Sequence, residues 1–506
     1  MADDRKSPLK KSLEEKVEQV LESYILADGS LTAGVRIVRL KGTRLPTYML
    51  DAPKIEAGTA AVLKEIQPEL LKKVSISTQE ALNIKMAEQL KAKFLETGMQ
   101  LIKSNIPHLP AGKVEMIARR MIQEMLGLGD IDFLLRDEQI EEICINSSAQ
   151  PVWIYHRKYG WIRSNLVMES EGQIWNYASG IARGVGRQIT NKTPLLDAYI
   201  SSGDRVNATI SPISYFGNTI TIRKFARKPW SITDYMRTKT ITPEVAALLW
   251  LAMQYETNLI VSGGTGAGKT SMLNVLSMFI PENQRVISIE QTREISLPAD
   301  LQWVPLVVRE PTGEGTGSIS MLDLMVNSLR MRPDRIIVGE IRRAEEAEVL
   351  FEAMHTGHSV CATMHAETVS ETINRLLNPP ISIQPLTLRS LQLIIAMHRD
   401  RRQNIRRVFE VGEIVPAENG VKENILYTWH PESDSLRADK QSTRLIRNIK
   451  TYTNMSDREI ERDLAGKQGI LEWMLEKDIN GVEEVGGIIS DYYANKEEVL
   501  ARVKKK

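Results

Sequence analysis

The chain has 506 residues, which is enough for about three or four domains that each bury their own core. Its 65 basic and 64 acidic side chains nearly cancel, which argues against a protein whose whole surface binds nucleic acid. Only two cysteines are present, Cys144 and Cys361, so neither a disulfide framework nor a zinc ribbon is indicated, and a reducing cytosol fits. The longest apolar run, residues 245–253, is about half a membrane span, so any membrane attachment is expected to be peripheral.

The first 114 residues are predicted to form a mostly helical leader. Ser12 and Glu15 have the spacing of a capping box. The apolar residues beside them share one helical face: Leu13, Val17, Val20 and Leu21. A second helix is predicted over residues 78–96, where apolar side chains recur every four positions. Such stripes usually belong to a core or to subunit contacts, and they carry no functional argument.

Residues 115–228 are predicted to form a compact α+β domain. A helix that ends near Leu126 is followed by short alternating segments typical of strands. These strands are expected at residues 142–146, 152–155, 205–210 and 219–223. Pro229 and the turn-forming residues after it suggest a linker over residues 229–242.

Between residues 243 and 415 predicted strands alternate with predicted helices, which indicates a parallel sheet with crossover helices. The strands are expected at residues 258–262, 285–289, 335–339 and 359–363. Glu290 and Glu340 end or follow two of them, and His365 lies just beyond a third. Charged groups in these places belong at the carboxyl edge of the sheet, where such folds bind ligands. Residues 416–506 are predicted to form a helical tail.

A complete phosphate-binding loop lies between the first of these strands and a predicted helix. The residues expected to bind nucleotide there are Gly263, Gly264, Thr265, Gly266, Ala267, Gly268, Lys269, Thr270 and Ser271. Backbone N–H groups of such a loop wrap a polyphosphate, and the helix N-terminus adds a positive dipole. Lys269 can reach the β- and γ-phosphates, while the Thr270 hydroxyl can ligate Mg²⁺. The sequence therefore predicts a site for a nucleoside triphosphate.

Two glutamates are candidates for the hydrolytic chemistry. Phosphoryl transfer to water needs a metal clamp, a residue that positions the water, and positive charge at the transition state. Glu340 ends a strand of the Walker B type, where it can hold a magnesium-bound water or polarise the attacking one. Glu290, at the end of a neighbouring predicted strand, is a candidate for the same task. The alternative is that both are ordinary solvated carboxylates that cap strand ends.

Four potential zinc ligands fall between residues 355 and 365: His355, His358, Cys361 and His365. They run through an apolar, strand-like segment, which alternates side chains instead of bringing them together, so a zinc site is not expected. We favour a histidine on the γ-phosphate side of the site, with His358 binding nucleotide and His365 acting in catalysis. Purely structural histidines are the alternative.

Together these motifs resemble those of the secretion ATPases that power type II and type IV secretion, pilus assembly and the archaeal flagellum. The resemblance covers about residues 115–415. Residues 289–294 resemble the acidic box of that family, residues 329–342 its Walker B segment, and residues 356–358 and 362–365 its histidine box. Segments of the preceding domain resemble the tight-adherence and type IV secretion branch: residues 129–131, 140–143, 194–198, 203–207 and 220–225. Residues 378–380 and the long tail are more similar to archaeal members.

The resemblance implies an α/β fold: a RecA-like P-loop ATPase domain with a parallel sheet, a smaller α+β domain before it, and helical additions at both ends. It further implies a cytoplasmic homo-hexamer that uses ATP and Mg²⁺, attached to the membrane through an integral platform protein, and that moves pilin-like subunits indirectly. Arg205 or Arg223 of the preceding domain would complete the catalytic site.

Two departures from the family pattern are visible. Gln291 stands where the acidic box usually has a second acid, so Glu290 acts alone or with Glu294. The segment after Glu340 is one residue longer than the common form, which leaves open whether Glu345 or Glu346 corresponds to a family glutamate.

The main alternative function is a RecA-like translocase or helicase on nucleic acid. Its support is the basic stretches at residues 399–407 and 223–228. Few aromatic residues are present, so no base-stacking platform is evident and nucleic acid is not the expected partner. A scaffold that binds ATP without turnover is the other alternative, which the intact Lys269, Thr270 and Glu340 disfavour.

Overall fold

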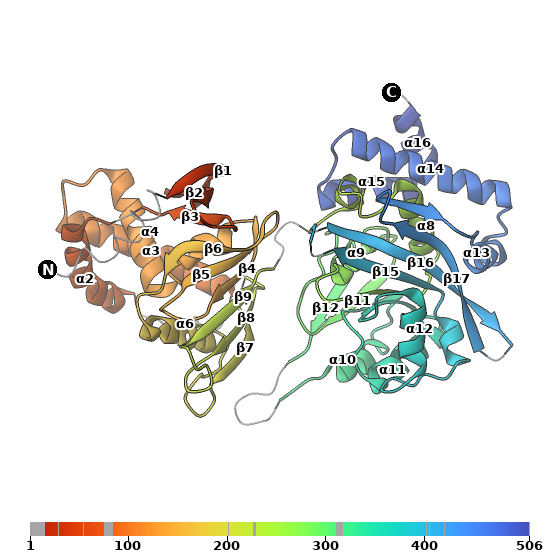
Figure 1. Cartoon of the computed structure of the whole chain (residues 1–506), viewed down its shortest axis with the longest axis horizontal. Helices are drawn as coiled ribbons and strands as arrows, with labels where there is room; N and C mark the ends of the chain where they lie inside the picture. The colour runs from red at the N-terminus through yellow and green to blue at the C-terminus, as the bar shows by residue number, and fades with distance from the viewer. Residues whose placement is uncertain are drawn as a thin grey trace. The chain divides into compact units, whose positions relative to one another are not determined.

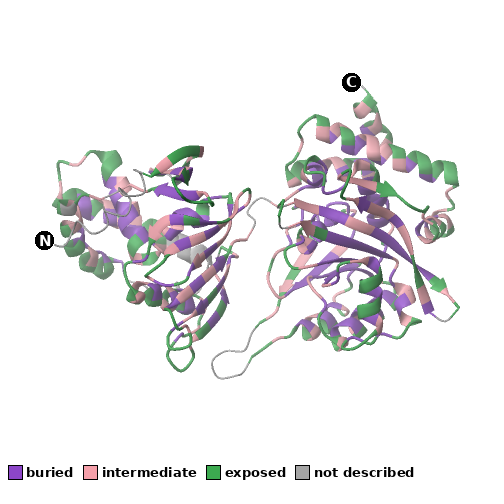
Figure 2. Ribbon diagram, viewed as in Figure 1, coloured by how far each residue is buried: buried purple, intermediate pink, exposed green. Residues whose placement is uncertain are grey.

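The computed structural model describes residues 16–504 except for 29, 54, 75–83, 201, 226–228, 310–316, 401, 404 and 419. It divides the chain into two compact units, residues 1–227 and 228–506 (Figure 1). Within the described residues each unit contains a nine-stranded sheet. Buried residues concentrate in the strands and on the helix faces turned toward them (Figure 2). The predicted capping box at Ser12 and Glu15 lies outside the described residues.

The sheet of the first unit has the strand order β1-β2-β3-β6-β5-β4-β9-β8-β7. Its strands are β1 (Val17–Asp28), β2 (Leu31–Leu40), β3 (Thr47–Asp51), β4 (Ile140–Ile145), β5 (Pro151–His156), β6 (Gly160–Val167), β7 (Leu195–Tyr199), β8 (Arg205–Thr209) and β9 (Thr219–Arg223). All neighbouring pairs are antiparallel except β3 and β6. The strands predicted between residues 142 and 223 are confirmed.

Five helices accompany this sheet. They are α2 (Ala57–Lys73), α3 (Ile84–Asn105), α4 (Ala111–Leu126), α5 (Ile131–Arg136) and α6 (Glu171–Gly184), counted over the residues that the structure describes. The apolar sides of α2, α3 and α4 share a core of their own, while residues of α5 and α6 pack with the sheet. Helices therefore occupy much of residues 57–126, whereas most of residues 17–51 forms strands of the same sheet as residues 140–223, so the mostly helical leader predicted over residues 1–114 is wrong for its first half.

The helix predicted at residues 13–21 is wrong where the structure describes it, because Val17–Asp28 is strand β1. This strand pairs with β2 as a hairpin, and its register shifts between Val17 and Gln19 and between Val20 and Glu22. Each shift moves the alternation of side chains by one residue. The resulting apolar spacing imitates one face of a helix, which is why the pattern misleads.

The sheet of the second unit has the order β12-β11-β13-β14-β10-β15-β16-β17-β18. Its strands are β10 (Leu259–Gly263), β11 (Arg285–Glu290), β12 (Gln302–Val307), β13 (Arg335–Val338), β14 (Ser359–Met364), β15 (Leu393–Asp400), β16 (Ile405–Ala417), β17 (Gly420–His430) and β18 (Ser435–Ala438). From β12 to β15 the pairs are parallel, and from β15 to β18 they are antiparallel. The predicted parallel sheet and its α/β class are confirmed.

Helices cover both faces of this sheet, as parallel strands require. One face packs with α8 (Pro243–Gln254), α9 (Lys269–Ser277) and the C-terminal helix α14 (Asp457–Glu476). The other packs with α10 (Met321–Ser328), α11 (Ala344–His355) and α12 (Val369–Leu377). Within β10, Leu259 and Val261 join the first core and Ile260 joins the second. Strand alternation therefore assigns consecutive side chains to opposite layers.

Two predictions about the flanking segments need correction. The expected linker, residues 229–242, contains α7 (Ile232–Arg237), which begins with a capping box of Ser231 and Asp234 and buries its apolar side chains in the core of the second unit. The expected helical tail, residues 416–506, begins with β17 and β18. Four of the five residues at positions 425–429 are aromatic or β-branched, and they favour a strand that pairs with β16.

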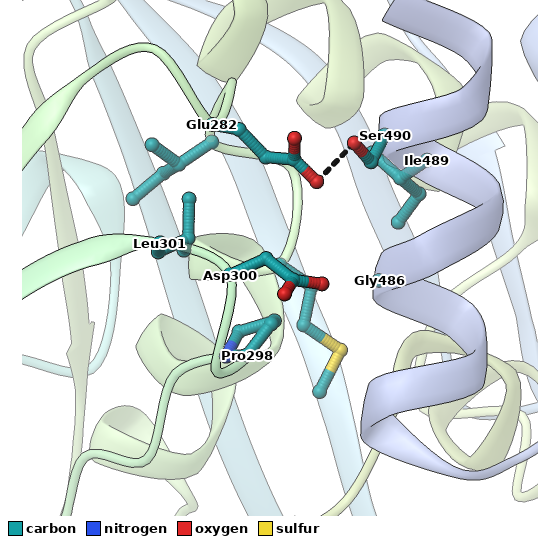
Figure 3. Close-up of a pocket in the computed structure, with 9 residues that line it drawn as sticks. Glu282, Pro298, Asp300, Leu301, Gly486, Ile489 and Ser490 are labelled. Carbon is teal, nitrogen blue, oxygen red and sulfur yellow. Dashed lines mark hydrogen bonds between the residues drawn. The ribbon is translucent and has the colours of Figure 1, made fainter.

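The rest of the tail is helical, as predicted. Its helices are α13 (Arg444–Thr453), α14, α15 (Val482–Ala494) and α16 (Lys496–Lys504). Helix α15 packs against the loop at residues 298–301, where a Cβ on Gly486 would lie 3.0 Å from Cγ of Pro298, and Ser490 donates a hydrogen bond to Glu282 (Figure 3). The cavity between them measures only about 10 Å³, room for one water at most, so it is not a nucleotide site. Among the described residues no helix is long and apolar enough to cross a membrane.

Candidate nucleotide-binding site

The phosphate-binding loop joins β10 to α9 at the carboxyl edge of the sheet. Gly263, Gly266 and Gly268 have φ values of 155°, 73° and 92°, a region that other residues rarely adopt. A Cβ at Gly263 would lie 2.7 Å from the Met397 carbonyl oxygen. The glycines are thus required by the backbone path itself. Successive backbone N–H groups in a glycine loop of this kind can bind phosphate.

Lys269 occupies the first position of α9 and is 9% exposed. Its Nζ atom lies 3.2 Å from the Gly264 carbonyl oxygen and 3.2 Å from Nδ1 of His365. His365 directly follows β14, which pairs in parallel with β10, so the two carboxyl ends meet at one edge. The structure therefore brings Lys269 and His365 together from segments distant in sequence.

His365 also contacts the predicted Walker B glutamate. Its Nε2 atom lies 2.7 Å from Oε1 of Glu340. Burial, followed by the charge of Lys269, lowers the pKa of His365 below its usual value, so the ring is neutral at pH 7. An ammonium group can only donate, so we assign Nδ1 as the acceptor from Lys269, which leaves the ring proton on Nε2. Nε2 approaches Oε1 of Glu340 closely, but Oε1 accepts no hydrogen bond among the described residues. Lys269, His365 and Glu340 form one polar chain.

The other carboxylate oxygen of Glu340 is held by Arg342, which sequence analysis did not single out. Oε2 of Glu340 accepts from Nε of Arg342 at 2.8 Å and from Nη2 at 2.5 Å. Nη1 of the same guanidinium donates to Oε1 of Gln291 at 2.6 Å. Gln291 is the residue that departs from the family's acidic box. In this chain its neutral amide is an acceptor that helps to orient Arg342.

Glu290 ends β11 and is buried, with 1% of its surface exposed. Oε1 accepts from the backbone N–H groups of Glu294 and Ile295 at 2.8 and 3.0 Å, while Oε2 has no hydrogen-bond partner among the described residues. Burial raises the pKa of Glu290 to about 7. The interpretation as a solvated strand cap is therefore wrong for Glu290. A Cβ on Gly339 would lie 3.4 Å from its Cγ, which places it beside the Walker B strand.

The extra length after Glu340 does not disturb the site. Oε2 of Glu346 accepts from the backbone N–H groups of Arg342 and Arg343 at 2.9 and 3.1 Å, and so fixes the start of α11. Glu346 is buried and Glu345 is exposed. Glu346 thereby holds the backbone of the residue that clamps Glu340.

The structure does not bring His358 to the phosphate-binding loop. His358 precedes β14 and its Nδ1 faces Thr356 and the Ala353 carbonyl oxygen, whereas His365 follows the same strand. Six strand residues separate the two histidines by about 20 Å. The assignment of His358 to nucleotide binding is thus wrong, because one extended strand cannot place both of its ends at one site. Among the described residues no group of three or more His, Cys, Asp or Glu side chains could hold a metal ion.

Thr270 and Ser271 follow Lys269 in the first turn of α9. Thr270 is partly exposed. Mg²⁺ usually keeps several waters and takes only one or two protein ligands when it binds with a nucleotide. The single hydroxyl at this position fits that mode. The Ser271 hydroxyl interacts with the buried phenol of Tyr235 on α7.

Arg205 and Arg223 belong to the first unit, where they are cross-strand partners on β8 and β9. Nε and Nη2 of Arg205 donate to the two carboxylate oxygens of Asp197 at 3.0 and 2.6 Å. Glu142 on β4 lies opposite Arg223 in the ladder. Arg205 is thus ordered by an acidic neighbour within its own unit.

The basic stretch at residues 399–407 is largely used within the second unit. Arg407 is buried, and its Nε and Nη2 donate to Asp434 at 2.7 and 2.9 Å. Nε of Arg406 donates to the Gly266 carbonyl oxygen at 3.1 Å. This stretch offers less charge to nucleic acid than its sequence suggests, which weakens the main support for a translocase.

The sequence is similar to that of known proteins over much of its length. The family model for the type II/IV secretion system protein matches residues 130–479 of the chain. The chain belongs to this family. The resemblance drawn from its acidic, Walker B and histidine motifs is confirmed at this level.

Individual relatives are similar to this chain in sequence. An uncharacterised protein of Methanocaldococcus jannaschii, MJ0900, is 33% identical over 382 residues, which cover 73% of this chain and 68% of that one. The type IV secretion system protein PtlH of Bordetella pertussis is 31% identical over 306 residues, which cover 54% of this chain and 89% of that one. The solved structure of the ATPase DotB from Yersinia pseudotuberculosis matches at 16% identity with a TM-score of 0.41, over 71% of this chain and 92% of that one.

Proposed function

We propose that this secretion-family protein is a motor ATPase. It hydrolyses ATP to ADP and phosphate and so powers the assembly or secretion of a type IV pilus-like filament, a pilus or an archaellum. The observation that carries the ATPase proposal is the polar chain from Lys269 through His365 to Glu340, set beside a complete phosphate-binding loop. The proposal that a filament is moved rests on family membership.

Each residue of the polar chain has a defined task in this proposal. Phosphate oxygens of bound ATP accept from Lys269, whose ammonium group is already held at the loop by the Gly264 carbonyl oxygen. The neutral His365 ring lies against Oε1 of Glu340 and limits the positions that its carboxylate can adopt. Glu340 then accepts a hydrogen bond from the attacking water and aligns it with the γ-phosphorus. Thr270 would hold Mg²⁺ together with the nucleotide, and the bound ion would neutralise charge at the phosphates.

Glu290 is proposed as an auxiliary group that exchanges a proton with the site. Its pKa of about 7 means that both protonation states are populated near neutral pH, which suits a general acid or base. Oε2 is the oxygen available for this role, since Oε1 is occupied by two backbone N–H groups. Glu294 donates its backbone N–H to Glu290, and we assign the proton exchange to Glu290.

The assembly and its partners follow from the family. We propose a homo-hexamer that docks on an integral membrane platform protein at the inner face of the cell membrane, with Arg205 or Arg223 supplying positive charge to the catalytic site. The hexamer is tested by light scattering with and without a non-hydrolysable ATP analogue. Monomers under both conditions, also after addition of the purified platform protein, would contradict the ring.

The ATPase proposal is tested by nucleotide binding and phosphate release with the purified full chain. Wild-type protein is expected to bind ATP and to release phosphate only with Mg²⁺. Lys269→Ala is expected to lose both properties, while Lys422→Ala, a matched change at an exposed lysine of β17, is expected to keep them. Equal activity of wild type and Lys269→Ala would refute the proposed site.

A further inference from the structure

The phosphate-binding loop has neighbours on both sides, because β10 lies between β14 and β15 and is parallel to both. The carboxyl end of β14 presents His365 on one side. The carboxyl end of β15 presents Arg399 on the other. Strand β16 is antiparallel to β15, so its amino end, with Arg406, returns to the same edge. Two arginines thus flank the loop opposite His365.

These arginines contact the loop directly. Arg399 and Arg406 are cross-strand partners in the β15–β16 ladder. Nε of Arg406 donates to the Gly266 carbonyl oxygen at 3.1 Å, and a Cβ on Gly266 would lie 2.5 Å from Nη1 of Arg399. Both side chains are partly exposed. Like charges directly opposite each other in a ladder are unfavourable, and a bound anion between them would offset this repulsion.

The contacts of Arg406 continue toward the start of α9. A Cβ on Gly268 would lie 3.4 Å from Cδ of Arg406 and 3.7 Å from the hydroxyl oxygen of Tyr235. The Tyr235 phenol in turn interacts with the Ser271 hydroxyl and lies within the field of the Arg406 charge. Arg406, Tyr235 and Ser271 thus enclose one side of the helix N-terminus.

The positions of the other catalytic groups orient the nucleotide. Lys269, His365 and Glu340 gather on the β14 side, which marks the γ-phosphate. The phosphate chain must leave the loop away from that group. We infer that Arg399 and Arg406 form an anion-binding pair for the nucleoside side of the phosphate chain and contact the α-phosphate. This inference rests on the proposed ATP site and adds two residues to it.

The inference predicts how nucleotide affinity responds to charge removal. A contact to the α-phosphate is shared by ADP and ATP, whereas a contact to the γ-phosphate is made by ATP alone. Removing either arginine should therefore weaken the binding of both nucleotides by the same factor. Charge-assisted hydrogen bonds to phosphate make that factor about tenfold for each arginine.

The test is calorimetric titration of the full chain with Mg-ADP and with a non-hydrolysable Mg-ATP analogue. Arg399→Gln and Arg406→Gln are each expected to lower the affinity for both ligands about tenfold. Arg406→Lys, which keeps the charge, should recover most of the affinity. Arg402→Gln is the matched control, because this exposed arginine lies in the same hairpin. The variant should bind both nucleotides with the affinity of wild type. Thermal unfolding without nucleotide shows that the variants are folded.

Three outcomes would overturn the inference: wild-type affinity in both glutamine variants, a loss confined to the ATP analogue, or no recovery with Arg406→Lys. The proposed function fails in a different way. It is contradicted when wild-type protein binds neither nucleotide or when Lys269→Ala binds as well as wild type. Tight, Lys269-dependent binding that ignores both arginines would leave the ATPase proposal standing and remove the arginine pair.

Discussion

The Nε2 atom of His365 lies 2.7 Å from Oε1 of Glu340. The second ring nitrogen of His365 faces Nζ of Lys269 at 3.2 Å, so one neutral ring links the phosphate-binding lysine to the candidate catalytic carboxylate. Phosphate that draws Lys269 toward it would change the contacts of His365 and, through the ring, those of Glu340. In the proposed site, nucleotide binding and water positioning would therefore be coupled.

His365→Ala is expected to reduce phosphate release about 100-fold, because Glu340 loses the group that orients one of its oxygens. ATP affinity should change by less than about threefold, since Lys269 keeps its place on the loop. His358→Ala, at the opposite end of β14, is the matched control and should hydrolyse ATP as wild type does. Steady-state kinetics together with equilibrium binding separates the two effects. Equal losses in both variants would contradict the placement of His365 alone at the site.

Arg342→Gln tests the clamp on the other oxygen of Glu340. Loss of the guanidinium frees Oε2 and also breaks the link to Gln291, so the rate of hydrolysis should fall about tenfold while ATP affinity stays close to wild type. Arg437→Gln, an exposed arginine on β18, serves as control. Unchanged turnover in Arg342→Gln would show that Glu340 does not depend on this contact.

Much of this site follows from sequence, and the exceptions have physical causes. Strand ends followed by Glu290, Glu340 and His365 meet because the carboxyl ends of parallel strands share an edge. Arg342 and Arg399 could not be assigned, since their roles depend on which strands are neighbours and on side-chain reach. A single signal existed for His358: it lies before the predicted strand instead of after it.

The fold was predictable to a similar degree. Buried parallel strands are visible in the sequence as apolar runs, and β10, β11, β13 and β14 lie where predicted. Strand β1 could not be recognised, because its register shifts disguise the alternation of a strand. Strand β17 depends on pairing with β16, a tertiary contact that a window of sequence does not contain.

Glu290 should make stability depend on pH. Its pKa in the folded protein, about 7, lies above the ordinary value of 4.5, so the native state holds a proton that the unfolded chain releases. This contribution is fully present below pH 4.5 and is lost as the pH rises to about 7, for a total of up to about 3 kcal/mol. Glu290→Gln should remove that decline.

Denaturant unfolding at pH 5 and pH 8 measures this contribution. Wild type should lose more stability between the two pH values than Glu290→Gln does. Glu345→Gln, which changes an exposed glutamate, should behave as wild type. The same pH dependence in wild type and Glu290→Gln would show that Glu290 is ionised at both pH values.

The backbone of the phosphate-binding loop is tested by Gly263→Ala. The new Cβ would clash with the Met397 carbonyl oxygen, and the φ of 155° is one that alanine rarely adopts. We therefore expect a loss of about 1–3 kcal/mol in stability and at least tenfold weaker nucleotide binding. Gly180→Ala, on α6 with no atom within 4 Å of the added Cβ, should gain about 0.5–1 kcal/mol and bind nucleotide normally. Equal behaviour of both variants would contradict the loop geometry.

The most direct test of the account is Glu340→Gln. The amide keeps the shape of the side chain but removes the charge that accepts from the attacking water. We predict that ATP and ADP bind within about threefold of wild type while phosphate release falls at least about 100-fold. Wild-type turnover in this variant would contradict the assignment of Glu340 as the residue that positions water. It would also contradict the proposed role of the polar chain that runs from Lys269 through His365 to Glu340.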